Sequence, residues 1–165
     1  MISRMKSYFK FLNLFNFLIF RNLIFVLSFT CLPISIFSNP NEILGLWVTY
    51  DEIGGEKSVV EIFEDKGYFY GKIISLKEPL DENGHKKICH QCNGAERDKP
   101  MVGLVIIQNM IYDGEEFSGG SILDPLTGNV YKCRIETVSN GNKLKVRGIF
   151  GLFGRTQTWI RKKIK

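Results

Sequence analysis

The sequence lacks both a helical pattern and a recognisable catalytic motif. After position 38, no run of 12 or more residues carries apolar side chains at helical spacing, which argues against strand–helix–strand units. There is no Gly-x-Ser-x-Gly nucleophile elbow and no phosphate loop ending in Gly-Lys-Ser or Gly-Lys-Thr. Gly148, Gly151 and Gly154 resemble a glycine-rich loop only in number, because no helix follows to bind phosphate at its N-terminus. We therefore assign no catalytic residues and expect no cofactor.

Acidic residues are absent from the first 38 positions. Four basic residues lie there, and an apolar run over residues 23–32 ends at Pro33, a pattern typical of a signal peptide. An uncleaved anchor is the alternative, because residues 22–41 carry no charge and are long enough to span a membrane. Pro33 and Pro40 disfavour a lipid-facing helix in that stretch. We predict a signal peptide over residues 1–38, cleavage before Asn39, and a periplasmic or secreted protein with no stable membrane span.

The positive charge of the chain comes mostly from this first segment. The full sequence has 22 basic and 17 acidic residues, and residues 1–38 hold 4 of the basic ones and none of the acidic ones. Residues 39–165 therefore have 18 − 17 = +1. A charge so close to neutral is no evidence for nucleic-acid binding, and we expect no nucleic-acid partner.

Residues 39–165 consist of short apolar runs separated by turn signals. Pairs of Asp or Asn with Gly, which favour tight turns, recur between runs of β-branched and aromatic residues. The runs predict eight strands, over residues 44–50, 57–64, 68–77, 104–111, 117–124, 129–138, 143–151 and 155–162. Short connections make sequential strands antiparallel, and closing the sheet removes its two exposed edges. We predict an all-β fold, a single eight-stranded antiparallel up-and-down barrel over residues 39–165, with a two-sheet sandwich as the alternative.

One connection, over residues 78–101, is too long for an ordinary link in a compact domain. It contains His85, His90 and a Cys-x-x-Cys pair, and it could cover one mouth of the barrel as a lid. The simpler interpretation is an ordered surface loop held by a disulfide.

Three cysteines follow position 38: Cys89, Cys92 and Cys133. In an exported protein, an odd number indicates one disulfide and one spare thiol, or a metal site. The bridge could join Cys89 to Cys92, or join one of them to Cys133. A zinc site that adds His85 or His90 has suitable ligands but lacks a second spaced pair, so we assign no metal.

The last predicted strand alternates two kinds of side chain. Arg155, Gln157, Trp159 and Arg161 lie on one side of it, and the threonines lie on the other. If the first and last strands pair, Trp47 can stack against one of these arginines. A Gly-x-Trp near the start, here Gly45 to Trp47, with a late arginine resembles the lipocalin superfamily. We expect Gly45, Trp47, Arg155 and Arg161 to be structural.

A longer resemblance runs from about Ile43 to Arg161. It rests on the ordered segments GLW, GKI, GLVIIQNM, FSGGSILDP, TGNVYKC, LKVRGIFG and FGRTQTWIR. These are similar to the bacterial envelope family called domain of unknown function 2147. The resemblance implies an exported, lipocalin-like barrel and no particular reaction, and the Cys-x-x-Cys loop resembles only some members.

Three functions fit a barrel of this kind. The first is binding of a small apolar or amphipathic molecule in the interior. The residues expected to line it are aromatic or aliphatic, although a core needs such residues anyway: Trp47, Tyr68, Tyr70, Ile74, Met110, Phe117, Tyr131 and Trp159. The second is an envelope interaction module with a filled barrel. The third is an enzyme, with Arg147, Arg155, Gln157 and a loop histidine at one mouth.

Overall fold

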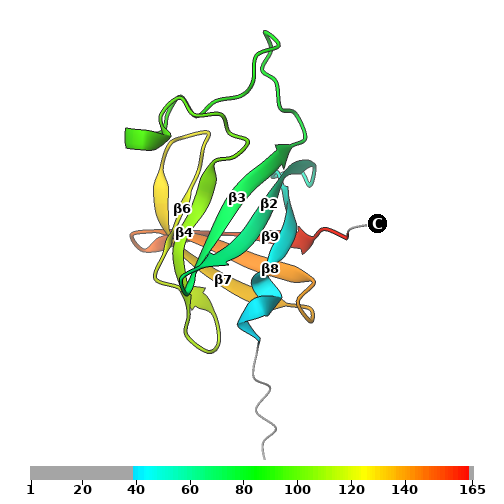
Figure 1. Cartoon of the computed structure of the whole chain (residues 1–165), viewed down its shortest axis with the longest axis vertical. Coiled ribbons are helices and arrows are strands. Elements are labelled where there is room, and N and C mark those ends of the chain that lie inside the picture. The colour runs from blue at the N-terminus through cyan, green and yellow to red at the C-terminus, as the bar shows by residue number, and fades with distance from the viewer. Residues whose placement is uncertain (1–38, 164–165) are drawn as a thin grey trace, which may run out of the picture. The chain divides into compact units, whose positions relative to one another are not determined.

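Figure 1 shows the computed structural model, which describes residues 39–163. Residues 1–38, where we predict the signal peptide, lie outside the described part. The strands are β1 (Gly45–Tyr50), β2 (Glu56–Asp65), β3 (Tyr68–Leu76), β4 (Val105–Tyr112), β5 (Phe117–Ser118), β6 (Ser121–Leu123), β7 (Val130–Val138), β8 (Lys143–Phe150) and β9 (Phe153–Arg161). Two short 3-10 helices, η1 (Pro40–Ile43) and η2 (Gly94–Glu96), complete the elements.

The strands close into an antiparallel barrel. Consecutive strands pair with each other, except β5 and β6, and β1 meets β9 through Trp47 opposite Arg161 and Val48 opposite Ile160. β5 and β6 both lie between β4 and β7 and together form one interrupted strand, so the nine segments make an eight-stranded barrel. This confirms the predicted eight-stranded up-and-down barrel and excludes the sandwich.

The predicted fifth strand, residues 117–124, is interrupted at its two glycines. Gly119 has φ +78°, in the left-handed region that glycine adopts freely. A Cβ on Gly120 would overlap the carbonyl oxygen of Gln108 on β4. The chain therefore bends at these residues and approaches β4 more closely than a side chain would allow.

One end of the barrel is closed by η1. The Asn39 side chain accepts a hydrogen bond from the backbone N–H of Asn41, which caps this short helix. Ile43 at its end is fully buried, and its carbonyl accepts a 2.8 Å hydrogen bond from Trp47 Nε1. Buried side chains from every wall fill this half of the barrel, among them Trp47, Val60, Met110, Phe117, Ile135 and Leu144.

The other end carries the long connection between β3 and β4, which extends above the barrel in Figure 1. Isolated bridges between Leu80 and Lys86 and between Ile88 and Pro100 give it internal order. Its middle packs on the turn between β6 and β7, where a Cβ on Gly128 would overlap the Gln91 carbonyl oxygen. The connection is therefore anchored to its neighbouring turn.

Cys89 and Cys92 form a disulfide within this connection, as one of the two predicted pairings has it. Cys133 is a free, buried thiol. Among residues 39–163, no three His, Cys, Asp or Glu side chains come together so as to hold a metal ion, so the zinc alternative has no ligand set there. In the same part of the chain, no helix has the length and apolar character needed to cross a membrane.

Candidate functional site

A cavity of about 410 Å³ occupies the half of the barrel beneath the long connection. Its volume lies within the range of roughly 300–1,000 Å³ that is common for small-molecule sites. It is bounded below by Trp159 and Val146, which belong to the packed core, and above by the exposed Phe150 and Phe153. The barrel is thus filled at its closed end and hollow at its open end.

Most of the cavity wall is apolar. Aliphatic side chains contribute from β3, β4, β6 and β8, including Ile73, Ile106, Ile122 and Val146. Gly148 on β8 faces this space, and a Cβ there would meet Ile122 and Tyr131 at 3.6 Å, an ordinary van der Waals distance. A side chain would fit at Gly148, so its absence enlarges the cavity.

One polar pair lies inside the cavity. Thr49 on β1 and Ser58 on β2 are cross-strand partners, both nearly buried, and their hydroxyl oxygens are 2.7 Å apart. One hydroxyl donates to the other, which leaves the second O–H able to donate to a bound molecule. The sequence prediction missed this pair, although Thr49 lies two residues after the inward-facing Trp47 and therefore on the same face of β1.

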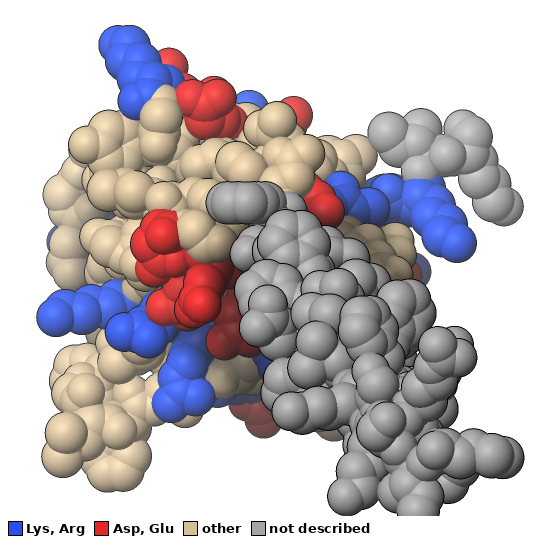
Figure 2. Space-filling model, turned by 90° about the horizontal axis from the view of Figure 1, so that it is seen from below, with Lys and Arg blue, Asp and Glu red and all other residues tan. Residues whose placement is uncertain are grey.

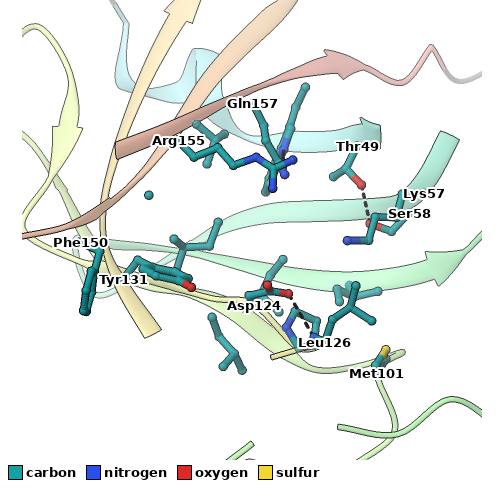
Figure 3. Close-up of a pocket in the computed structure, with 18 of the residues that line it drawn as sticks. Thr49, Lys57, Ser58, Met101, Asp124, Leu126, Tyr131, Phe150, Arg155 and Gln157 are labelled. Carbon is teal, nitrogen blue, oxygen red and sulfur yellow. Dashed lines mark hydrogen bonds between the residues drawn. The ribbon is translucent and has the colours of Figure 1, made fainter. Parts of the chain in front are cut away.

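The remaining polar side chains lie around the cavity in Figure 3, with Arg155 and Gln157 on one side, Tyr131 and Asp124 on another, and Lys57 beside Ser58. Arg155 Nη2 is 2.9 Å from Glu52 Oε1 at the exposed rim. Gln157 Oε1 accepts a hydrogen bond from Trp159 Nε1 at 3.3 Å, which leaves its amide N–H groups as donors. An apolar wall with a few convergent polar groups suits a molecule that is mainly apolar and carries a polar group.

The long connection supplies one side chain to the cavity wall, Met101. The segment around Gln91 packs on the β6–β7 turn, as described above. The long connection, which was expected to cover the barrel mouth as a lid, therefore lies mainly beside the cavity.

Five of the eight predicted lining residues point into the barrel. Tyr131 and Trp159 line the cavity. Trp47, Met110 and Phe117 lie in the packed half below it and are at most 1% exposed. These three are core residues, because the closed half of the barrel leaves no space beside them.

The other three predicted lining residues, Tyr68, Tyr70 and Ile74, are placed wrongly. On β3 the inward positions are Phe69, Gly71 and Ile73, and alternation puts the intervening side chains outside. Tyr70 stacks on Phe63 of β2 and donates a hydrogen bond to Asn109. This outer stack explains why an aromatic residue occupies a position outside the barrel.

The two arginines that were expected to be structural have different roles. Arg161 lies over the Trp47 ring, with Cζ 4.2 Å from the centroid. Its guanidinium donates to the carbonyls of Gly141, Leu44 and Glu42. Gly45 beside it has φ +114°, a backbone conformation that favours glycine. Burial lowers the pKa of Arg161, and the charge of Glu42 partly offsets that effect. Arg155, six residues earlier, lies at the cavity rim and makes no such contact with Trp47.

Two of the residues predicted for the enzymatic alternative line the cavity, and the others lie elsewhere. Arg155 and Gln157 line the cavity, but Arg147 is exposed on the outer face of β8. His85 and His90 lie in the long connection beside Asp81 and Asp98, and neither histidine lines the cavity.

Comparisons with known proteins agree with this architecture. Residues 45–161 match a family model described as uncharacterized protein conserved in bacteria (DUF2147). Protein HP1028 from Helicobacter pylori, described as belonging to the lipocalin family, is similar in structure, with a TM-score of 0.60 and 29% sequence identity. The similarity covers 73% of this chain and 83% of that one. A search of the curated proteins finds no match. The family match spans most of the chain, from the first strand of the barrel to the last, and the chain belongs to this bacterial DUF2147 family.

Proposed function

We propose that this protein is exported and that its barrel binds one small apolar or amphipathic molecule. The observation that carries the proposal is the cavity of about 410 Å³ at the open end, with its mainly apolar wall. A filled barrel that acted only through its loops would have no such space. The similarity to a lipocalin-family protein is consistent with small-molecule binding.

The polar groups favour an amphipathic ligand. Its apolar part would lie against Ile73, Ile122 and Val146, where burial removes apolar surface from water. Its polar part would lie near Arg155 and Gln157, where donors are available close to solvent. Export is inferred from the residue pattern of positions 1–38.

The test is titration with N-phenyl-1-naphthylamine, an apolar probe whose fluorescence rises when it leaves water. We expect saturable binding by the wild type and at least about ten-fold weaker binding by Gly148→Leu, whose side chain would occupy the cavity. Thr158→Leu is the control, because it places a leucine on the exposed outer face of the adjacent β9.

Equal affinity of all three proteins would show that the probe binds elsewhere and would refute the cavity as the site. Thermal melts of each variant establish that the barrel remains folded.

A further inference from the structure

Exposed apolar side chains are concentrated at the open end of the barrel. The structure leaves 11 large apolar side chains exposed among residues 39–163, and three of them, Tyr68, Ile74 and Ile111, lie on the side wall. The other eight lie in or next to loops of the open end: Ile53, Leu80, Val102, Leu126, Val130, Phe150, Leu152 and Phe153. Scattered single apolar residues are normal on a surface, but such a group at one end marks a contact site.

The tip of the β8–β9 hairpin is the most exposed part of this group. Phe150 is 72% exposed, Leu152 99% and Phe153 80%. Phe150 and Phe153 are directly opposite each other, and the tight turn between them uses Gly151 at φ +58°. The tip is therefore a narrow projection that presents apolar side chains to solvent.

Basic side chains lie on the strands behind the tip. Residues 143–163 carry seven Lys or Arg and no Asp or Glu, and two of the seven form ion pairs with other segments, Lys145 with Glu136 and Arg155 with Glu52. Arg147 lies three residues before Phe150 on the outer face of β8, and Lys132 lies opposite Ile149 on the neighbouring strand. Neither Arg147 nor Lys132 forms an ion pair within residues 39–163. On the face seen in Figure 2, from below the view of Figure 1, acidic and basic side chains lie close together.

We propose that the open end docks on a membrane surface that carries anionic lipids, with the tip Phe150–Phe153 inserted at the boundary between headgroups and acyl chains. Apolar residues at such a boundary remove their surface from water, and basic residues behind them attract anionic headgroups within a Debye length of about 10 Å. The exposed apolar residues come from four connections at this end of the barrel, and three of them, Leu126, Phe150 and Phe153, line the cavity.

Phe150 and Phe153 of the tip also line the cavity, so docking is tested at Leu152 between them. Leu152 does not line the cavity, so a change there tests docking without changing the ligand site. The barrel core is drawn entirely from residues 43–159, which lie within the part of the chain that the structure describes. A chain beginning at Asn39 is therefore suitable for the experiment, and it removes the apolar N-terminal run, which would itself bind lipid.

The experiment is co-sedimentation with phosphatidylcholine vesicles that contain about 30% phosphatidylglycerol, at low salt. We expect the wild type to sediment with these vesicles and Leu152→Ser to partition about ten-fold less, as the loss of one buried leucine predicts. Ile111→Ser, which removes a 49% exposed side chain from the wall, should bind like the wild type. Arg147→Ala should weaken binding at low salt and have little effect in about 0.5 M salt, where charges are screened.

Three results would overturn the proposal. The first is a wild type that does not sediment with the vesicles, and the second is a Leu152→Ser variant that sediments as well as the wild type. The third is a wild type that is dimeric in solution and becomes monomeric with Leu152→Ser, which would make the tip an interface between two copies of the chain. Probe binding by the cavity is measured separately, so either proposal can fail alone.

Discussion

Replacing Arg161 tests how the closed end of the barrel is held. Its guanidinium joins η1, the β7–β8 turn and the ring of Trp47, which are segments far apart in the sequence. Arg161→Ala removes all of these interactions at once and leaves backbone carbonyls at the barrel end without their donor. We expect this substitution to be among the most destabilising of any half-exposed residue in the protein.

The expected loss follows from the contacts. Hydrogen bonds from a charged donor contribute about 1.5–3 kcal/mol each, and we take the lower value because water reaches this end. Applied to the bonds to Gly141 at 2.6 Å and Leu44 at 2.9 Å, and with about 0.5–1 kcal/mol for the cation–π contact, this gives roughly 3.5–4 kcal/mol. In a domain of this size, that corresponds to a fall in Tm of about 10–15 °C. Arg161→Lys keeps the charge but cannot reach several carbonyls together, so we expect about half the loss.

The assay is urea and thermal unfolding followed by circular dichroism. Arg155→Ala is the matched control, because Arg155 lies on the same side of β9 and forms an exposed ion pair with Glu52. Such pairs contribute about 0–1 kcal/mol. If Arg161→Ala and Arg155→Ala unfold with free energies within about 1 kcal/mol of each other, the assigned role of Arg161 is wrong.

Two further predictions concern the cysteines and the long connection. Burial raises the pKa of the Cys133 thiol to about 12, so the thiol stays protonated at pH 8. Mass spectrometry should find Cys133 unmodified by iodoacetamide in the native protein and modified in urea. Rapid modification of the native protein would contradict the burial of this thiol. Gly128→Ala should lower the unfolding free energy more than Gly84→Ala does. Both glycines have positive φ, but only a Cβ on Gly128 would meet the backbone of Gln91. Gly84→Ala should cost about 1 kcal/mol, and an equal loss for both variants would mean that the contact between Gly128 and Gln91 does not matter.

The sequence predicted the barrel because the lengths of its apolar runs and the positions of its turn residues both indicate short antiparallel strands. Apolar runs of strand length alternate with Asp-Gly and Asn-Gly turns, and eight antiparallel strands close without leaving an edge. It did not predict the break at Gly119 and Gly120. A glycine pair in an apolar run is compatible with a continuous strand, and only the approach of Gly120 to Gln108 makes a bend necessary.

The side of β3 that faces inward was predicted wrongly because aromatic residues lie on both faces of it. Lys72 is on the same face as Tyr70 and Ile74, and this charged residue marks that face as the outer one, a signal that the prediction overlooked. The outer face is aromatic because Tyr70 stacks on Phe63 and binds Asn109. Similarly, Arg155 and Arg161 lie on the same side of β9, and only the register with β1 places Arg161 opposite Trp47.

The presence of a cavity was also beyond the sequence. Eight strands can enclose either a filled interior or a small ligand site, and the difference here depends on Gly148 and on where the large core residues lie. Trp47, Met110 and Phe117 are all in the closed half, which leaves the open half hollow.

The central claim is that the open half holds a molecule. The most direct test is native mass spectrometry of the protein purified from the envelope fraction of the cells that make it, followed by organic extraction. We predict a chain that begins at Asn39 and carries a bound mass that is lost on denaturation, recovered in the organic phase and absent from Gly148→Leu. A wild-type protein that carries no bound mass and also fails to bind N-phenyl-1-naphthylamine would contradict the claim.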